Sequence, residues 1–298
     1  MRRRSRLLLL SVAALGLALL LLARCATLPP IPPPRPAAEL AAAGFSAGTV
    51  EALGRAVHWI AAGRGAGPAV LFVHGSPGDW RAYESLLADP GLRAAARLVA
   101  FDRPGFGATG GGALPRLADQ AAVAALVLAS AAPGARAVVV GHSLGGPIAA
   151  RLAVDRPDLV AGLLLVAPSI DPALERHRWY NVAGAMRVVQ WFLPREWIAS
   201  NREIWPLRGE LADMAPRLAG LRVPATVIQG TEDDLVDPGN AAFVARAMTG
   251  TPVRRVDVPQ EGHFVLWTRG DLVRAEIGRL LDAAAPEPGA APGSRAER

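Results

Sequence analysis

Short apolar runs rich in β-branched residues alternate along this chain with longer stretches of helical period, from about residue 56 onward. The run Ala137–Val140 is apolar throughout, which is typical of a strand that is buried on both faces. Strands of this kind, separated by helices, form a mainly parallel sheet covered by helices on either side. The sequence therefore predicts an α/β fold, with its functional residues in the loops that follow the strands.

The positions of the expected elements follow from the period of the apolar residues and from the turn residues between them. Strands are expected at Ala56–Ala61, Ala69–Val73, Leu98–Phe101, Ala137–Val140, Gly162–Val166, Ala225–Ile228 and Val253–Val258. Helices are expected near Trp80–Ala88, Leu117–Ser130, Leu144–Val154, Asn240–Met248 and Leu272–Ala283.

A different kind of segment interrupts the alternation at residues 172–221. It has helical stretches, no convincing strand, and four of the seven tryptophans of the chain. Because it stands between two strands, we expect it to form a helical cap over the sheet. Its tryptophans either pack the cap onto the core or form an apolar roof over a substrate, and the predicted substrate contacts are Trp179 and Trp191.

The N-terminus has the pattern of a segment that enters a membrane. Met1–Arg6 is cationic, and Leu7–Ala23 is uncharged and consists mostly of Leu and Ala. As a helix this run would span roughly 26 Å against a hydrocarbon core of about 30 Å, so a signal peptide and an uncleaved anchor are both consistent with it. Positive residues stay on the cytoplasmic side, so we expect the rest of the chain to be exported to the periplasm and held at the membrane.

Cys25 is the single cysteine, which excludes an intrachain disulfide and a cysteine-based zinc site. Its place after the apolar run resembles the lipobox of bacterial lipoproteins, in which the cysteine is lipidated. Arg24 departs from that motif, which has a small residue before the cysteine. Lipidation at Cys25, an uncleaved anchor, simple cleavage of the leader and a cytoplasmic membrane tether are the alternatives.

Composition divides the chain into successive parts. Six prolines between residues 29 and 36 predict a stiff, extended spacer. The predicted division is a signal or anchor segment at 1–25, a Pro-rich linker at 26–48, a core at 49–171 and 222–284, the helical cap at 172–221, and a disordered tail at 285–298.

The positive charge is concentrated in the leader. The 32 basic residues are all arginine and stand against 26 acidic residues. Five of the arginines lie in the first 25 residues, which contain no acid, and this leaves 27 basic against 26 acidic residues. The body therefore lacks the basic excess on which nucleic-acid binding depends, and no nucleic-acid partner is expected.

A serine flanked by glycines follows the predicted strand Ala137–Val140. The segment Gly141-His142-Ser143-Leu144-Gly145 has the pattern G-x-S-x-G at a strand-to-helix turn. At the tip of such a turn the serine adopts a strained backbone conformation, and the residues two before and two after it approach so closely that both must lack a side chain. Gly141 and Gly145 meet this requirement, so Ser143 is the predicted nucleophile.

On this motif the chain resembles the α/β-hydrolase superfamily, over roughly residues 50–283. The resemblance implies a triad in the chain order nucleophile, acid, histidine. The stretch Gly230–Pro238 is similar to the family's acid loop and implies Asp233 as the acid, with Asp171 after an earlier strand as the alternative. His263, which follows Gly262 after the last predicted strand, resembles the family's catalytic histidine.

The resemblance also implies an oxyanion hole made of two backbone amides. The segment His74-Gly75-Ser76-Pro77 is similar to a family loop in which the residue before the proline faces the substrate carbonyl. The implied donors are therefore the N–H groups of Ser76 and Leu144, and His74 is expected to organise the loop through bonds to the backbone. The sequence shows no metal-ligand spacing, and the chemistry needs no metal and no cofactor.

A serine at the turn argues against relatives that use aspartate there to open epoxides or displace halide. The resemblance implies a serine hydrolase that cleaves a carboxylic ester, or a related acyl bond, of a small-molecule substrate through an acyl-enzyme. Hydrolysis of a carbon–carbon or amide bond, acyl transfer, and a catalytically silent binding module are the alternatives.

Overall fold

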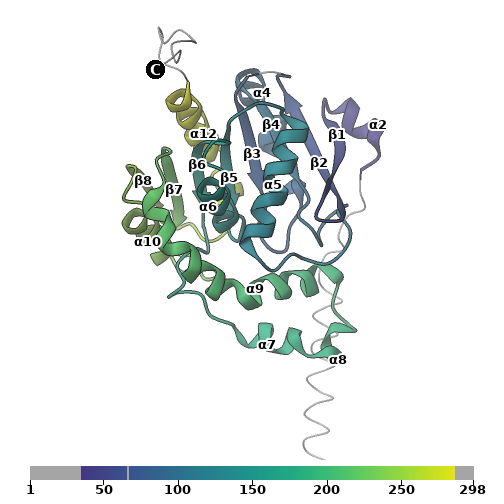
Figure 1. Ribbon diagram of the computed structural model, residues 1–298, viewed down its shortest axis with the longest axis vertical. Coiled ribbons are helices and arrows are strands. Elements are labelled where there is room, and N and C mark those ends of the chain that lie inside the picture. The colour runs from purple at the N-terminus through teal and green to yellow at the C-terminus, as the bar shows by residue number, and fades with distance from the viewer. Residues whose placement is uncertain (1–34, 66, 286–298) are drawn as a thin grey trace, which may run out of the picture.

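Neighbouring residues of each central strand point to opposite faces of the sheet, as the two-residue period of a strand requires. In β3 (Ala69–Val73), Leu71 packs into one apolar cluster, whereas Val70 and Phe72 pack into the cluster on the other face. All residues of β3 are buried. A strand that is apolar on both faces needs helices on both sides, and Figure 1 shows this arrangement.

The computed structural model describes residues 35–65 and 67–285. The predicted leader, Cys25 and the predicted tail from residue 286 onward lie outside the described residues. Within the described part of the chain, no helix combines the length and the apolar character that crossing a membrane requires.

Eight strands form one sheet in the order β1-β2-β4-β3-β5-β6-β7-β8. β2 is antiparallel to both of its neighbours, and every other neighbouring pair is parallel. The predicted α/β fold with a mainly parallel sheet is therefore confirmed. The strands are β1 Ser46–Ala52, β2 Arg55–Gly63, β3 Ala69–Val73, β4 Arg97–Phe101, β5 Ala137–His142, β6 Val160–Val166, β7 Ala225–Gly230 and β8 Val253–Val258.

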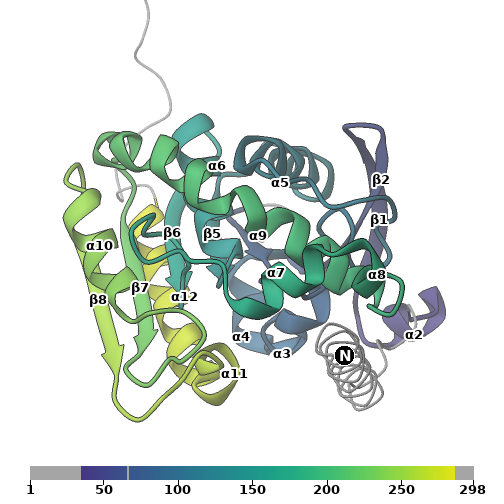
Figure 2. The same ribbon diagram turned by 90° about the horizontal axis from the view of Figure 1, so that it is seen from below.

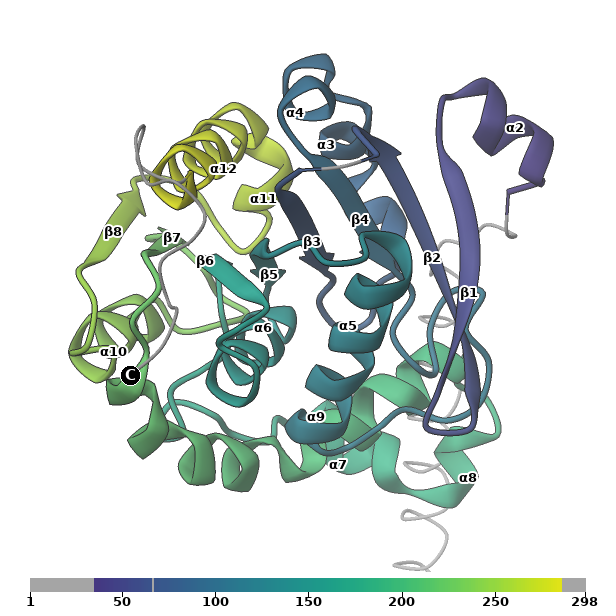
Figure 3. The same ribbon diagram turned by 45° about the horizontal axis from the view of Figure 1, so that its top comes forward.

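Helices cover both faces of this sheet (Figures 1 and 3). One face carries α5 Leu117–Ala131, α6 Gly145–Asp155 and α10 Gly239–Ala247. The other face carries α3 Glu84–Ala88, α4 Pro90–Ala95, α11 Val265–Thr268 and α12 Gly270–Ala284. The remaining elements are α2 Ala37–Ala42, η1 Trp80–Tyr83, α7 Trp179–Ala185, α8 Arg187–Gln190, α9 Arg195–Met214 and η2 Ala215–Gly220.

The folded body begins earlier than the predicted boundary at residue 49. The sequence predicts a linker over 26–48, but α2 and the first residues of β1 lie within it. Leu40 and Phe45 are buried in the same apolar cluster as Trp80. The prediction omits β1 because this edge strand is mostly exposed and lacks the apolar run that marks the central strands.

Helices connect β6 to β7, in the region where the sequence predicts a cap. We call residues 167–224 the helical insertion. Figures 1 and 2 show α9 crossing the end of the sheet, with α7 and α8 on the side of α9 that faces away from the sheet. The insertion therefore has an inner layer, α9, and an outer layer formed by α7 and α8.

A buried ion pair joins the inner layer to the sheet. Arg103 follows β4, and its two terminal nitrogens donate to the two carboxylate oxygens of Glu203 in α9 over 2.6 and 2.9 Å. Both side chains are 1% exposed. Gln120 of α5 accepts from Arg103 and donates to Glu203, so three elements share one polar cluster.

Replacing Glu203 by Ala leaves the Arg103 guanidinium buried without its counter-charge. We expect the Glu203→Ala change to lower the free energy of unfolding by about 3–5 kcal/mol, the cost of breaking a buried pair by removing one partner. Denaturant unfolding followed by circular dichroism measures this change.

The matched control is Asp158→Ala, which removes one partner of the exposed pair between Arg156 and Asp158. Exposed pairs contribute little, so this variant should unfold like the wild type. A double variant, Arg103→Met with Glu203→Leu, should recover part of the loss because no unpaired charge remains. Equal stability of Glu203→Ala and the wild type would contradict the proposed role of the pair.

Candidate active site

The carboxyl ends of four parallel strands lie side by side at one edge of the sheet. The register pairs Val73 at the end of β3 with Gly141, and His142 at the end of β5 with Val166 of β6. The end of β7 follows in the same row, since Ile228 pairs with Val166. The loops that carry the predicted site residues therefore start from neighbouring positions, as expected for a sheet of this type.

Ser143 occupies the sharp turn between β5 and α6 that its flanking glycines predict. Its φ is +54°, in the left-handed region that a residue with a side chain rarely adopts. A Cβ on Gly141 would lie 2.3 Å from the carbonyl oxygen of Gly145, and a Cβ on Gly145 would lie 2.0 Å from that of Val73. The steric reason given for the two glycines is therefore confirmed.

His263 and Asp233 form a hydrogen bond between the loops that follow β8 and β7. Nδ1 of His263 donates to Oδ2 of Asp233 over 2.8 Å, and both residues are buried. The backbone also joins the two loops, since the amide of Glu232 donates to the carbonyl of Glu261. With Nδ1 occupied, the Nε2 atom of His263 remains as the group that can accept a proton.

The Asp233 carboxylate is held ionised by its hydrogen bonds. Burial by itself raises the pKa of this group, but the bonds from His263 and from the amides of Val236 and Leu235 outweigh it, so that the net pKa lies below the usual value. Gln229 donates a further hydrogen bond to Oδ2 over 3.1 Å. An ionised carboxylate so placed orients the imidazole and stabilises its protonated form.

Asp171, the alternative acid, serves a turn instead. Its Oδ1 accepts from the amide of Ala173 over 2.8 Å, and its own amide donates to Asn240. This is capping of the loop that enters the insertion. The structure thus places Asp233, rather than Asp171, against His263.

His142 connects the nucleophile turn to the histidine loop. Its Nε2 donates to the carbonyl oxygen of His263 over 3.1 Å, and the two ring centroids are 4.8 Å apart. Burial, together with the nearby His263, lowers the pKa of His142 to about 4, so the ring is neutral near pH 7. Among the described residues, no hydrogen bond is recorded between the Ser143 hydroxyl and the His263 ring, a contact that often tightens only when substrate binds.

The predicted oxyanion loop lies directly beside the nucleophile. A Cβ on Gly75 would be 3.0 Å from the Cβ of Ser143. The structure gives the amides of Ser76 and Leu144 no hydrogen-bond partner within the described chain, so both remain available as donors. The Ser76 hydroxyl donates to the hydroxyl of Ser200 in α9 over 2.8 Å, which ties this loop to the insertion.

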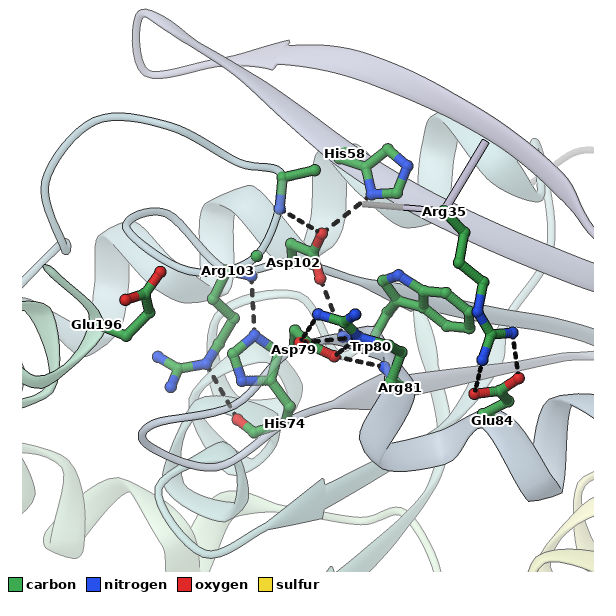
Figure 4. A network of polar contacts seen from close by, with 12 residues as sticks. Arg35, His58, His74, Asp79, Trp80, Arg81, Glu84, Asp102, Arg103 and Glu196 are labelled. Atoms are coloured by element: carbon green, nitrogen blue, oxygen red, sulfur yellow. Dashed lines mark hydrogen bonds and ion pairs between the residues drawn. The ribbon is translucent and has the colours of Figure 1, made fainter. Parts of the chain in front are cut away.

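His74 and Arg103 hold the oxyanion loop in place (Figure 4). Nδ1 of His74 donates to the carbonyl of Gly75, and Nε2 accepts from the amide of Arg103. The Arg103 side chain donates in turn to the carbonyls of His74 and Gly75. Burial and the neighbouring guanidinium lower the pKa of His74 well below its usual value. The predicted organising role of His74 is confirmed.

Asp102, the residue before Arg103, organises the segments around the end of β4. Figure 4 shows its carboxylate between His58 and Trp80, where it accepts from the His58 ring and from the amide of Trp80. The amide of Ala108 also donates to it. Asp102 therefore holds β2 and η1 in place, and Arg103 holds the oxyanion loop in place.

Trp179 and Trp191 lie at the surface of the insertion. Trp179 begins α7 with 70% of its surface exposed, and Trp191 follows α8 with 80% exposed. Neither packs onto the core, so that interpretation is wrong for these two residues. Their predicted role as substrate contacts stays a prediction.

Two supporting residues have no role in the sequence predictions. Arg103 is the second residue after the buried strand β4, and a charged residue so close to the end of a buried strand is a signal for such a role. Gln229 is a fully buried polar residue at the end of β7, and a polar side chain in that position is a comparable signal. Within residues 35–65 and 67–285, no group of three or more His, Cys, Asp or Glu side chains could hold a metal ion.

Known proteins match this chain over most of its body. A model of the alpha/beta hydrolase family matches residues 70–287. The Klebsiella pneumoniae (strain 342) protein named putative carbamate hydrolase RutD is 28% identical over 230 residues, which cover 66% of this chain and 84% of that protein. The Mycobacterium tuberculosis esterase Rv0045c is 39% identical over 118 residues, which cover 38% of this chain and 37% of that protein.

The fold also matches solved structures. The enol-lactonase from Burkholderia xenovorans LB400 superposes with a TM-score of 0.63 and is 19% identical in sequence. The match covers 78% of this chain and 99% of the lactonase chain. Identity at this level is a likeness of fold.

The low pKa of His142 makes the stability of the protein depend on pH. An unfolded histidine titrates near pH 6.5, so below that pH the unfolded chain binds a proton that the folded chain takes up only near pH 4. We expect this residue alone to lower the free energy of unfolding by about 3 kcal/mol between pH 6.5 and pH 4, and by nothing further below pH 4.

Denaturant unfolding of His142→Gln at a series of pH values checks this expectation, since glutamine keeps an N–H donor but does not titrate. The variant should lose less stability than the wild type across this window. His177→Gln removes an exposed histidine and is the control. Parallel pH curves for the wild type and His142→Gln would refute the assignment.

Proposed function

Because this chain belongs to the alpha/beta hydrolase family, we propose that it is a serine hydrolase that cleaves a carboxylic ester, with Ser143 as nucleophile and His263 as base. The observation that carries the proposal is the hydrogen bond from Nδ1 of His263 to Asp233. It fixes the tautomer in which Nε2 is free to accept a proton. The sharp turn at Ser143, at the end of β5, supplies the hydroxyl.

The proposed reaction passes through an acyl-enzyme. A serine hydroxyl is a weak nucleophile, so His263 removes its proton as Oγ of Ser143 attacks the ester carbonyl. The carbonyl oxygen becomes an oxyanion that the amides of Ser76 and Leu144 stabilise. His263 then returns the proton to the leaving alcohol, and afterwards activates a water that hydrolyses the acyl-serine ester. Asp233 stays ionised throughout and stabilises the imidazolium.

Hydrolysis of a carbamate, rather than of a carboxylic ester, is a second candidate function. One relative is named an esterase and another a putative carbamate hydrolase, so both an ester and a carbamate are reasonable substrates for the proposed nucleophile. Parallel assays with a chromogenic ester and a carbamate of the same alcohol separate the two. A larger kcat/KM for the ester is expected, because the alcohol leaves from a more reactive carbonyl.

Replacing Ser143 by Ala should abolish turnover of chromogenic esters and labelling by a fluorophosphonate, which reacts with an activated serine. Asp233→Asn should lower kcat by about 10³–10⁴-fold, because the imidazole loses the partner that sets its tautomer. Steady-state kinetics with esters of increasing acyl length measure both effects and the size of the acyl site.

Asp171→Asn is the matched control, since it makes the same carboxylate-to-amide change at the alternative acid. It should keep most of the activity. Persistent labelling of Ser143→Ala would place the reactive serine elsewhere. A folded wild type that neither turns over esters nor reacts with the fluorophosphonate would favour a silent binding module instead.

We further propose that the protein is exported and held at a membrane by its N-terminal segment. The cationic start, the apolar run Leu7–Ala23 and Cys25 support this proposal. The Pro-rich stretch that follows would connect the bilayer-spanning or lipid-anchored end to the folded body as an extended segment.

Cell fractionation should recover the protein in the membrane fraction, with the body accessible to protease from the periplasmic side. Cys25→Ser separates the two modes of attachment. If Cys25 carries the lipid, the variant loses incorporation of an alkyne-labelled fatty acid; an uncleaved anchor leaves attachment unchanged. Recovery of the full-length wild type as a soluble cytoplasmic protein would contradict the proposal.

A further inference from the structure

The outer layer of the insertion exposes a set of large apolar side chains. They lie within residues 179–192 on α7, on α8 and just after it, and each is more than half exposed. Soluble proteins seldom expose this many large apolar groups in one segment without a partner for them. We call the set the insertion face; its members are Trp179, Val182, Met186, Val188, Trp191 and Phe192.

The insertion face points away from the rest of the protein. The buried residues of α7 are Asn181 and Gly184, and the Asn181 side chain donates to Asn201 of α9. At 3.6 residues per turn, Trp179 and Val182 lie on the opposite side of α7 from this buried pair. Figures 1 and 2 agree that α9 separates α7 and α8 from the sheet, so no other described element covers this face.

The charge of the same segment is positive. Residues 176–195 contain four arginines and no acidic residue. Of the 32 arginines, 5 lie in the leader and 4 in this segment, which leaves 23 basic against 26 acidic residues elsewhere. The positive excess is therefore confined to the N-terminus and to the segment that bears the insertion face. Its four arginines are Arg176, Arg178, Arg187 and Arg195.

Exposed tryptophan and aliphatic side chains interspersed with arginine, without acids, are the chemistry of a helix that lies in a lipid headgroup layer. The indole and alkyl groups enter the acyl boundary, and the guanidinium groups meet lipid phosphates. Charge decides against a second copy of this chain as the occupant. Arg195 pairs with Glu196, but the other three arginines of the segment pair with no carboxylate among the described residues, so two such faces would bring six like charges together.

We propose that the insertion face docks on the surface of an anionic lipid bilayer, with Trp191 and Phe192 inserted at headgroup depth and Arg187 at the phosphates. This surface is distinct from the N-terminal segment, and it places the folded body itself on the membrane. It depends on no catalytic step, so its test is independent of the proposed hydrolase activity.

The tryptophans allow the docking to be measured in the full-length protein. All seven lie at residue 59 or later, so none belongs to the N-terminal segment. Quenching of tryptophan emission by lipids with brominated acyl chains therefore reports contact of the folded body with the bilayer, even when the N-terminus also holds the protein there. The probes are vesicles of brominated phosphatidylglycerol and of brominated phosphatidylcholine.

Wild-type protein should be quenched more strongly in the phosphatidylglycerol vesicles, and Trp191→Phe should lose part of that quenching. Arg187→Glu should lower the ratio of docked to undocked protein by about tenfold, because it exchanges attraction to the anionic surface for repulsion. Arg246→Glu, which makes the same charge change at an exposed residue of α10, is the matched control and should behave like the wild type.

Circular dichroism of each variant checks that it is folded, and no core residue is changed. The proposal would be overturned if quenching were equal in both vesicle types and if neither Arg187→Glu nor Val188→Asp altered it. Sedimentation showing lipid-free self-association that Trp191→Phe and Val188→Asp abolish would also overturn it, because the face would then be an interface between copies of this chain.

Discussion

A single buried guanidinium organises the end of the molecule where the proposed chemistry takes place. Arg103 donates to the carbonyls of His74 and Gly75 in the oxyanion loop, and to the carboxylate of Glu203 in α9. A buried charge is tolerated only while its partners remain in place. The loop that carries the Ser76 amide and the helix that covers the sheet edge are therefore positioned by the same ion pair, and neither can shift far without uncovering a charge.

The two halves of the proposed catalytic pair are held in different ways. Ser143 is placed by its backbone, since the turn is so tight that Cβ atoms on the flanking glycines would collide with main-chain oxygens. His263 is placed by side chains, with Asp233 on its ring and His142 on its carbonyl. His142 can serve both elements because burial keeps it neutral, so it donates to a carbonyl without adding a positive charge beside the base.

What the sequence predicts well is what short stretches of chain determine by themselves. The strand, turn and helix around Ser143 are adjacent in sequence, and so is the steric requirement on their glycines. The choice between Asp233 and Asp171 needed a distance to His263, which no local pattern contains. The contact between Arg103 and Glu203 joins residues 100 positions apart. The sequence does not predict β1, because a mostly exposed edge strand has no apolar run. The direction of Trp191 depends on how α7 and α8 pack on α9.

A hydrolase at a membrane has to keep its oxyanion loop in place and also present a surface to the lipid. In the insertion, the inner layer serves the first requirement and the outer layer the second. α9 is bound to the core by the buried Glu203 and Ser200, and it stabilises the oxyanion loop. α7 is attached through smaller contacts, among them the Asn181–Asn201 pair and the bonds from Arg178 to the carbonyls of Asp234 and Leu235. Those last bonds bring the start of the insertion face next to the acid loop. A lipid surface in contact with α7 and α8 would therefore lie close to the proposed site, while the Arg103–Glu203 pair beneath α9 holds the oxyanion loop in place.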